Sequence, residues 1–114
     1  MIEKASDAGL WYLELLQQQR ANGSFFLSPL LETASGKPMS ELKHWATFVC
    51  VTHRDQVEDI LATGLALVLL RLKAKEDEPS WKKAAQKARA WLKKTGAQGE
   101  NGLDLLDWLS GRFA

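Results

Sequence analysis

The chain has 114 residues, of which 46% are hydrophobic and 25% are charged, and its formal net charge is +1. These values are ordinary for one globular domain, and they exclude a disordered chain. They also exclude a molecule whose overall field attracts nucleic acid or an anionic membrane, so such binding would need a local patch. The single Cys50 cannot form an internal disulfide, which fits a reducing compartment, and we expect a cytoplasmic protein.

The first predicted helix begins near residue 7. The Ser6 hydroxyl can accept a hydrogen bond from an amide of the first helical turn, and Asn22-Gly23 can adopt the left-handed geometry that ends a helix. Between these signals, aromatic and leucine residues recur on one face. Two leucines, Leu10 and Leu13, lie off that face.

Two short helices and an irregular segment are predicted next. Ser28 supplies a capping hydroxyl directly before Pro29, which suits a first helical turn, so we expect a helix over 29–34. Another helix should begin near Ser40. Residues 47–52 are rich in β-branched side chains, but no second strand of similar quality exists to pair with them, so we interpret this stretch as irregular or a short helix.

The longest apolar pattern predicts a central buried helix over residues 55–75. Asp55 and Glu58 have the spacing of a capping box, and the residues that follow are apolar around most of the circumference. Gly64 costs a helix roughly 1 kcal/mol relative to alanine, so we expect it to admit a closely packed neighbour, such as a Trp ring or a backbone. The sequence therefore predicts an all-α fold, a compact bundle of about five helices around this buried helix, in a single helical interaction domain spanning 1–114.

Residues 80–96 form the most regular amphipathic pattern in the chain. At about 100° per residue, two groups of side chains separate onto opposite faces. The apolar face holds Trp81, Ala84, Ala85, Ala88, Trp91 and Leu92, and the other holds Lys82, Lys83, Gln86, Lys87, Arg89, Lys93 and Lys94. We expect one helix that packs on the core with its cations in solvent. A turn at 99–102 and a terminal helix ending at Gly111 should follow.

Cys50, His53 and His44 are the soft metal-ligand candidates. Structural zinc takes four ligands, usually in two close pairs, and the chain has only these three. A nucleophilic cysteine would need an activating base in a cleft, whereas the apolar segment around Cys50 favours burial. We therefore expect an inert buried cysteine, solvent-facing histidines, no metal, no cofactor, no catalytic residues and no enzyme activity.

Three motifs appear in a fixed order along the chain. They are Asn22-Gly23-Ser24-Phe25 with Leu27-Ser28-Pro29, then Asp59-Ile60-Leu61-Ala62-Thr63, then Ala84-Ala85-Gln86-Lys87-Ala88 with Trp91-Leu92-Lys93-Lys94-Thr95-Gly96. In order and spacing they resemble the C-terminal major-vault-protein-interacting domain of vault poly(ADP-ribose) polymerase and the related C-terminal domain of cytoplasmic von Willebrand factor A domain-containing proteins. The resemblance spans most of the chain. It departs where the family usually has a Trp and this chain has Phe25 or Phe26, and the tail from Leu103 to Leu109 has no counterpart.

The resemblance implies a docking function. The domain would bind the major vault protein and target its parent protein into the vault, a ribonucleoprotein particle. ADP-ribosyl transfer by the parent would belong to another domain, and no position here matches the catalytic residues of the polymerase. We expect no small-molecule substrate, and no membrane, because the longest apolar run, residues 65–70, is too short to cross a bilayer.

Apolar residues outside the core stripes are where a docking partner should gain affinity. The candidates are Leu10, Leu13, Phe26 and Trp108. Trp108 is included because it lies about 60° to one side of the apolar face of the terminal helix, which favours exposure. The alternative function is electrostatic nucleic-acid binding through the basic face of residues 82–94. Balanced charge overall and no aromatic platform among the lysines favour the protein partner.

Overall fold

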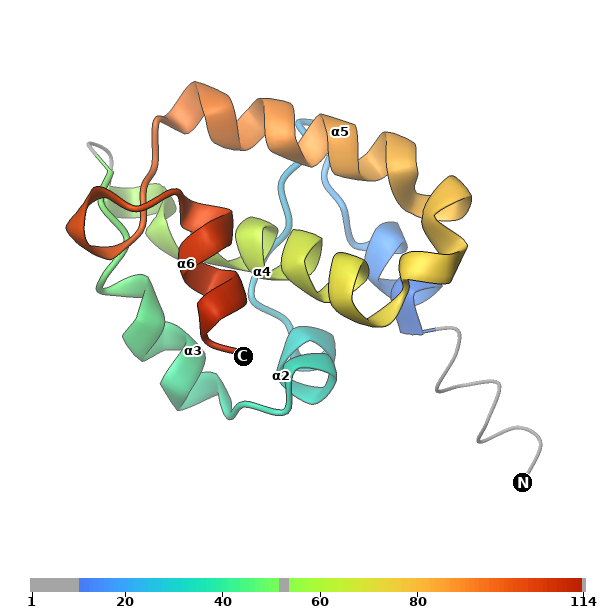
Figure 1. Ribbon diagram of the computed structural model, residues 1–114, viewed down its shortest axis with the longest axis horizontal. Coiled ribbons are helices and arrows are strands. Elements are labelled where there is room, and N and C mark those ends of the chain that lie inside the picture. Colours follow the sequence, from blue (N-terminus) through green and yellow to red (C-terminus); the bar gives the residue numbers. More distant parts are fainter. Residues whose placement is uncertain (1–10, 52–53, 114) are drawn as a thin grey trace.

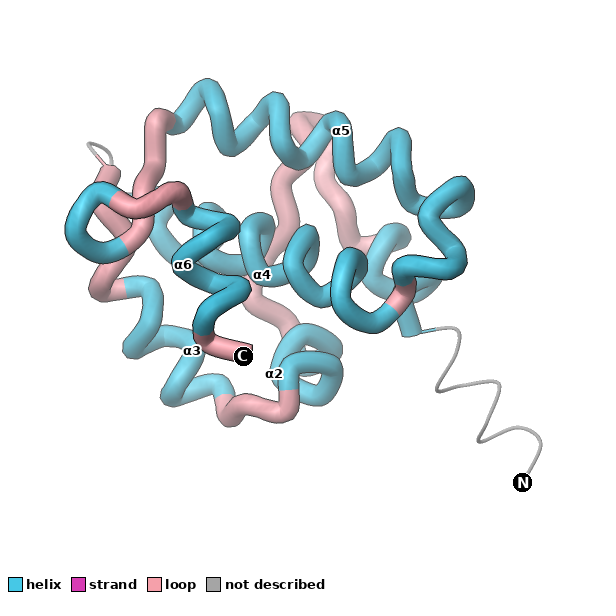
Figure 2. The backbone as a smooth tube through the Cα atoms, in the orientation of Figure 1, coloured by secondary structure: helices cyan, strands magenta, loops and turns pink. Residues whose placement is uncertain are grey.

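A computed structural model of the protein describes residues 11–51 and 54–113. Its helical elements are residues 11–17, α2 (Pro29–Ser35), α3 (Met39–Ala46), the 3₁₀ turn η1 (Arg54–Gln56), α4 (Val57–Lys73), η2 (Lys75–Asp77), α5 (Glu78–Thr95), η3 (Glu100–Gly102) and α6 (Leu105–Gly111) (Figure 1). Figure 2 shows these helices joined by loops, and the described part of the chain contains no β-strand. The predicted all-α fold is therefore confirmed. The predicted start of the first helix lies outside the described residues.

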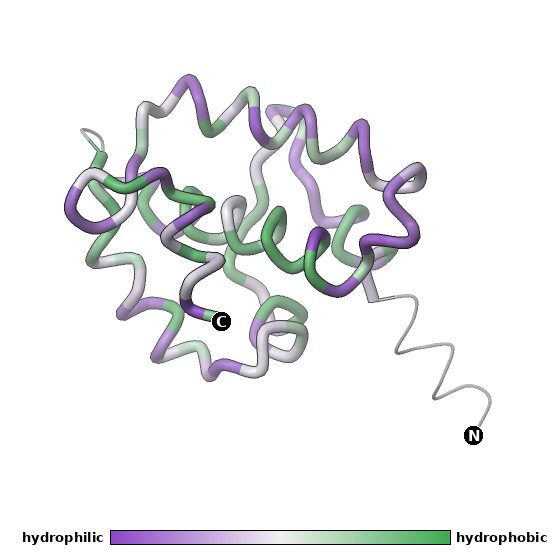
Figure 3. Tube along the Cα trace, viewed as in Figure 1, coloured by the Kyte–Doolittle hydropathy of each residue, from purple (hydrophilic) through white to green (hydrophobic). Residues whose placement is uncertain are grey.

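Helix α4 forms the centre of the fold. Every residue from Ile60 to Leu70 is buried, and α2, α3, α5 and α6 all contact this helix. Figure 3 shows the middle of α4 as an apolar stretch, whereas polar and apolar residues alternate along α5. A helix that is apolar around its whole circumference must be covered on all sides, which confirms the predicted buried central helix. Across the described residues, no helix is both long enough and apolar enough to cross a membrane.

The start of α4 differs from the predicted capping box. Arg54–Gln56 forms a 3₁₀ turn, Gln56 occupies the N-cap, and no side chain caps the helix. Asp55 therefore lies inside this turn, one residue before the N-cap. In a capping box, the side chain that accepts from the third helical amide belongs to the N-cap residue itself. Glu58 still lies in the first turn, where the positive end of the helix stabilises a carboxylate.

Gly64 marks the place where α6 approaches α4. A Cβ added at Gly64 would lie 2.8 Å from Leu109 Cδ1 and 3.2 Å from Leu105 Cδ2. Carbon atoms in van der Waals contact are about 3.5–4.0 Å apart, so only a residue without a side chain permits this packing. The predicted close approach is confirmed, but two leucine side chains fill the place rather than a Trp ring or a backbone.

Helix α5 runs back over α4 and is amphipathic as predicted (Figure 1). Trp81, Ala85 and Ala88 are buried, and the Trp81 Nε1–H donates a hydrogen bond of 2.7 Å to the Ala74 carbonyl. The small alanine side chains let the two helix backbones approach each other. The helix ends at Gly96, whose φ of 68° is the left-handed geometry of a C-cap.

The first helical segment ends at residue 17, earlier than Asn22-Gly23 predicted. The Gln18 and Gln19 amides donate to the carbonyls of Leu15 and Leu16, three residues back, at 2.9 and 3.2 Å. Such bonds tighten the last turn into 3₁₀ geometry and end the helix. The left-handed Gly23, with φ of 99°, instead turns the loop that follows.

The two short helices begin close to their predicted positions. Ser28 caps α2 by accepting a hydrogen bond from the Leu31 amide, and Pro29 stands in its first turn, as predicted. Helix α3 begins at Met39, one residue before the predicted Ser40. The Met39 amide donates to Glu32 Oε2 at 2.7 Å, so a carboxylate of α2 satisfies the first amide of α3.

Candidate functional site

The predicted burial of Cys50 is wrong, because its side chain is exposed. The Cys50 amide donates to the Gln98 carbonyl at 2.8 Å, and the Gln98 amide donates back to the Cys50 carbonyl at 2.9 Å. This antiparallel bridge keeps the backbone extended. Successive side chains of an extended segment point to opposite sides, so Val49 enters the core and Cys50 faces outward.

The histidines do not join Cys50 in a site within the described residues. His44 is exposed, as predicted, and its ring meets Phe48 edge-on at 5.1 Å. His53 lies outside the described residues. Throughout 11–51 and 54–113, no group of three or more His, Cys, Asp or Glu side chains has an arrangement that could hold a metal ion.

The four predicted docking residues differ in where the structure places them. Leu10 lies outside the described residues, and Leu13, Phe26 and Trp108 differ in the exposed fraction of their side chains. Leu13 is 41% exposed, which agrees with its predicted position off the core face. Phe26 is half-buried, and the Arg20 guanidinium carbon lies 5.4 Å from its ring centroid. Arg20 also forms an ion pair with Asp59 at 2.6 Å, so an intramolecular cation already covers part of the Phe26 ring.

Trp108 is buried, with 7% of its surface exposed, so its predicted exposure is wrong. The turn that contains Gly99 lies against the ring: a Cβ added there would be 2.8 Å from Trp108 Cγ. On other sides, the Arg112 guanidinium carbon lies 4.6 Å from the Trp108 ring centroid and the Phe48 ring lies 6.2 Å away. The helical pattern identified the side of α6 on which Trp108 lies. It could not show that another segment covers that side.

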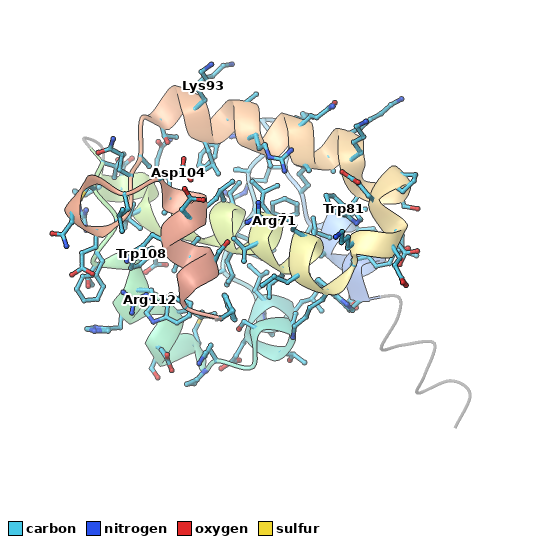
Figure 4. All side chains as sticks on the ribbon, in the orientation of Figure 1. Arg71, Trp81, Lys93, Asp104, Trp108 and Arg112 are labelled. Carbon is cyan, nitrogen blue, oxygen red and sulfur yellow. The ribbon has the colours of Figure 1, made fainter. Side chains whose placement is uncertain are left out.

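An open hollow of about 270 Å³ lies between α5 and α6. Its lining residues are Arg89, Leu92 and Lys93 of α5, Ala97 of the following loop, and Asp104, Leu105 and Leu106 at the start of α6. Beside it, a narrow crevice too tight to admit water shares Arg89 and Leu106 and adds Leu67, Val68 and Arg71 of α4. We call these two sets of residues together the α5–α6 groove. Figure 4 shows Lys93 extending outward from α5, Asp104 at the start of α6, and Arg71 near the middle of the molecule.

The α5–α6 groove combines an aliphatic lining with charged edges. Leu92 and Leu106 are half-buried, and Leu67, which lines the adjoining crevice with Leu106, is buried. The Arg71 Nη2 donates to Ser110 Oγ at 2.9 Å, which positions this cation beside α6. Asp104 caps α6. Its Oδ1 accepts hydrogen bonds from the first amides of that helix, at 3.0 and 3.1 Å. The arrangement offers an apolar surface bordered by cations.

Sequence reasoning did not find this groove. It assigned Leu92 to the core and treated Arg89 and Lys93 as part of a solvated face. The local signal is that Arg89 stands three residues before Leu92 and four residues before Lys93, spacings that make Arg89 a surface neighbour of both on the helix. The wall opposite them comes from α6, and its position depends on how α6 packs against Gly64.

Comparison of the chain with protein-family models, with curated proteins and with solved structures gave no match. The family resemblance carried by the three motifs therefore remains an expectation.

Proposed function

We propose that this chain is a protein-docking domain that binds the major vault protein and thereby targets its parent protein into the vault particle. Two separate lines support the proposal. One is the resemblance of the three motifs to a family of vault-interacting domains, and the other is the α5–α6 groove.

The motifs that carry the resemblance meet in the interior of the fold. The Phe25 amide donates to Thr63 Oγ1 at 2.8 Å, which joins the first motif to the second. A Cβ added at Gly23 would lie 2.6 Å from the carbonyl oxygen of Lys87, so the first motif also presses against the third. Because the motifs pack against one another inside the fold, they form its scaffold rather than an exposed binding site. The resemblance therefore supports a kind of domain, while the docking surface must be sought elsewhere.

The observation that carries the docking function is the α5–α6 groove. Protein interfaces gain most of their affinity from a few apolar side chains that enter pockets and lose their water. Leu92 and Leu106 offer such a place, because both remain half-buried in the absence of a partner. The hollow of about 270 Å³ is at the lower end of the roughly 300–1,000 Å³ of small-molecule sites, so it suits an anchoring side chain better than a cofactor.

Co-sedimentation with assembled vault particles tests the proposal. The domain alone stays in the supernatant at speeds that pellet the particles, and this sample is the control. We expect saturable co-sedimentation at an ionic strength of about 0.15 M, since docking on an apolar groove survives physiological screening. A domain that remains in the supernatant at every particle concentration would contradict the proposed function.

Electrostatic nucleic-acid binding is the alternative function, and the exposure of the α5 cations favours it. The exposed cations are Lys82, Lys83, Lys87, Arg89, Lys93 and Lys94. The lining of the groove argues for the protein partner, because it is aliphatic and single-stranded nucleic acids bind by stacking bases on aromatic rings. A gel-shift titration separates the two functions. Phosphate binding weakens steeply as salt rises, and docking anchored by an apolar side chain weakens less.

A further inference from the structure

We infer that the α5–α6 groove binds an acidic segment of the partner protein, with one bulky apolar side chain between Leu92 and Leu106 and flanking carboxylates on Arg89, Lys93 and Arg71. This inference rests on the proposed docking function and adds the chemistry of the bound segment and the surface that binds it.

The lining of the groove offers an apolar place for one side chain of the partner. Leu92 and Leu106 line the same hollow from α5 and α6, and Leu67 and Val68 of α4 line the narrow crevice that adjoins it. Leu92 and Leu106 are half-buried, while Leu67 and Val68 are buried. A partner side chain placed between the walls would remove the remaining apolar surface of both leucines from water, which is favourable. A hollow of about 270 Å³ has room for one large side chain rather than for a whole helix.

The edge of the groove carries the charges that a bound segment would meet. Arg89 and Lys93 on α5 border the hollow, and a third cation, Arg71 on α4, lines the adjoining crevice. Among the ion pairs of the described residues, none involves any of these three side chains. The one carboxylate that lines the hollow, Asp104, caps α6 and offsets one of these three positive charges. The edge is therefore net positive, and its electrostatic complement is a segment that carries carboxylates.

The spacing of the cations limits where those carboxylates can lie. Arg89 and Lys93 are four residues apart on α5, which places them about 6 Å apart along the helix axis with Leu92 between them. The acidic residues of the partner should therefore lie within about one helical turn of its apolar anchor. This pattern differs from a long acidic tract, and a peptide can reproduce it.

The test uses two double variants of the full chain that change net charge equally. R89E/K93E reverses the edge of the groove. K83E/K94E is the control and reverses two exposed lysines of the same helix that do not line the groove. Around the axis of α5, each of these lysines lies about 100° or more from the midpoint between Arg89 and Lys93. Both variants place one substitution in the last turn of α5, so the effect on the helix dipole is matched. Circular dichroism confirms that both fold.

The probe is a fluorescein-labelled peptide of about 12 residues, or about three helical turns, with one leucine or phenylalanine flanked by glutamates. We expect fluorescence anisotropy to show binding to the wild-type chain. Affinity should fall about tenfold for R89E/K93E and stay within about twofold for K83E/K94E. A peptide with lysines in place of the glutamates should bind R89E/K93E better than it binds the wild-type chain. A glutamate peptide whose anchor is replaced by serine should bind the wild-type chain about tenfold more weakly.

The vault co-sedimentation, repeated with both double variants, distinguishes failure of this inference from failure of the proposed function. Weaker association of R89E/K93E alone supports both. Full association of R89E/K93E overturns the inference and leaves the docking function standing. If the wild-type chain fails to co-sediment, the proposed function fails, and the peptide measurements alone then support or overturn an acidic ligand at the groove. Any one of three further results would also overturn the inference. Association with the particles could weaken equally in both variants, the chain could bind RNA in a way that both variants lose, or the chain could form a dimer that R89E/K93E abolishes.

Discussion

The two sides of helix α6 meet their neighbours in different ways. On one side, Leu105 and Leu109 pack against Gly64 so closely that no Cβ fits between the helices. On the other side, Leu106 faces α5 across the open α5–α6 groove. Leu105 and Leu106 are adjacent in sequence but lie about 100° apart around the helix. One turn of helix therefore buries one leucine in the core and leaves the next half-buried at the groove, so we expect that stability and the proposed docking can be changed separately.

Replacing the two kinds of leucine should separate these roles most clearly. Leu109→Ala removes a fully buried side chain beside Gly64, and we expect the free energy of unfolding to fall by about 3 kcal/mol. Leu106→Ala removes a half-buried side chain, and we expect a fall of about 1 kcal/mol or less together with weaker partner binding. Urea denaturation followed by tryptophan fluorescence measures both. Equal destabilisation by the two substitutions would show that Leu106 is as much a core residue as Leu109.

Gly64→Ala tests the close packing itself. The added Cβ would overlap Leu109 Cδ1 and Leu105 Cδ2, so we expect a loss of about 2 kcal/mol despite the higher helix propensity of alanine. The matched control is Gly111→Ala, at the end of α6, where an added Cβ meets no atom within 4 Å. We expect the control to leave the free energy of unfolding unchanged or to raise it slightly. A Gly64→Ala protein as stable as the control would mean that α4 and α6 separate at little cost.

Thr63→Val tests the next residue of α4, which faces the loop instead of α6. The Thr63 hydroxyl accepts a hydrogen bond from the Phe25 amide and donates one of 2.7 Å to the Asp59 carbonyl. Valine keeps the shape and leaves a buried amide unpaired, so we expect a loss of about 1–2 kcal/mol. Thr63→Ser retains the hydroxyl and should lose less. Thermal unfolding of the two variants side by side measures the difference, and equal losses would point to the methyl group rather than the hydrogen bond.

Charge reversal at the edge of the groove should have the smallest effect on stability. Arg89 and Lys93 are exposed, so each substitution in R89E/K93E should change the free energy of unfolding by no more than about 0.5 kcal/mol. Differential scanning calorimetry can measure this change against K83E/K94E. A large loss confined to R89E/K93E would contradict our assignment of these cations to partner binding and would give them a structural role.

The sequence predicted those parts of the fold that depend on local pattern. The all-apolar circumference of α4, the two faces of α5, and the Ser28-Pro29 start of α2 were each visible in a short window of residues. The close approach at Gly64 could also be inferred, because a glycine inside a buried helix has few other uses. The predictions of side-chain exposure that failed concern Cys50 and Trp108. Their exposure is decided by the bridge to Gln98 and by the turn at Gly99, which are segments distant in sequence from the helical patterns.

The candidate site could not be predicted for the same reason. Arg89, Leu92 and Lys93 look like ordinary positions of an amphipathic helix, and Leu106 looks like one more core residue of the terminal helix. They become a groove only because α5 and α6 both pack on α4 and leave space between them. Local periodicity gives the face of each helix. It does not give the distance between two helices that pack on a third.

Amide hydrogen exchange of the chain with and without assembled vault particles tests the central claim most directly. Slower exchange on binding would mark the segments that the partner covers or rigidifies. We predict that protection increases from Arg89 through Asp107, the stretch that contains both walls of the groove, and that exchange at residues 11–17 and in α2 stays unchanged. Unchanged exchange over the groove, with protection gained at another surface, would contradict the account.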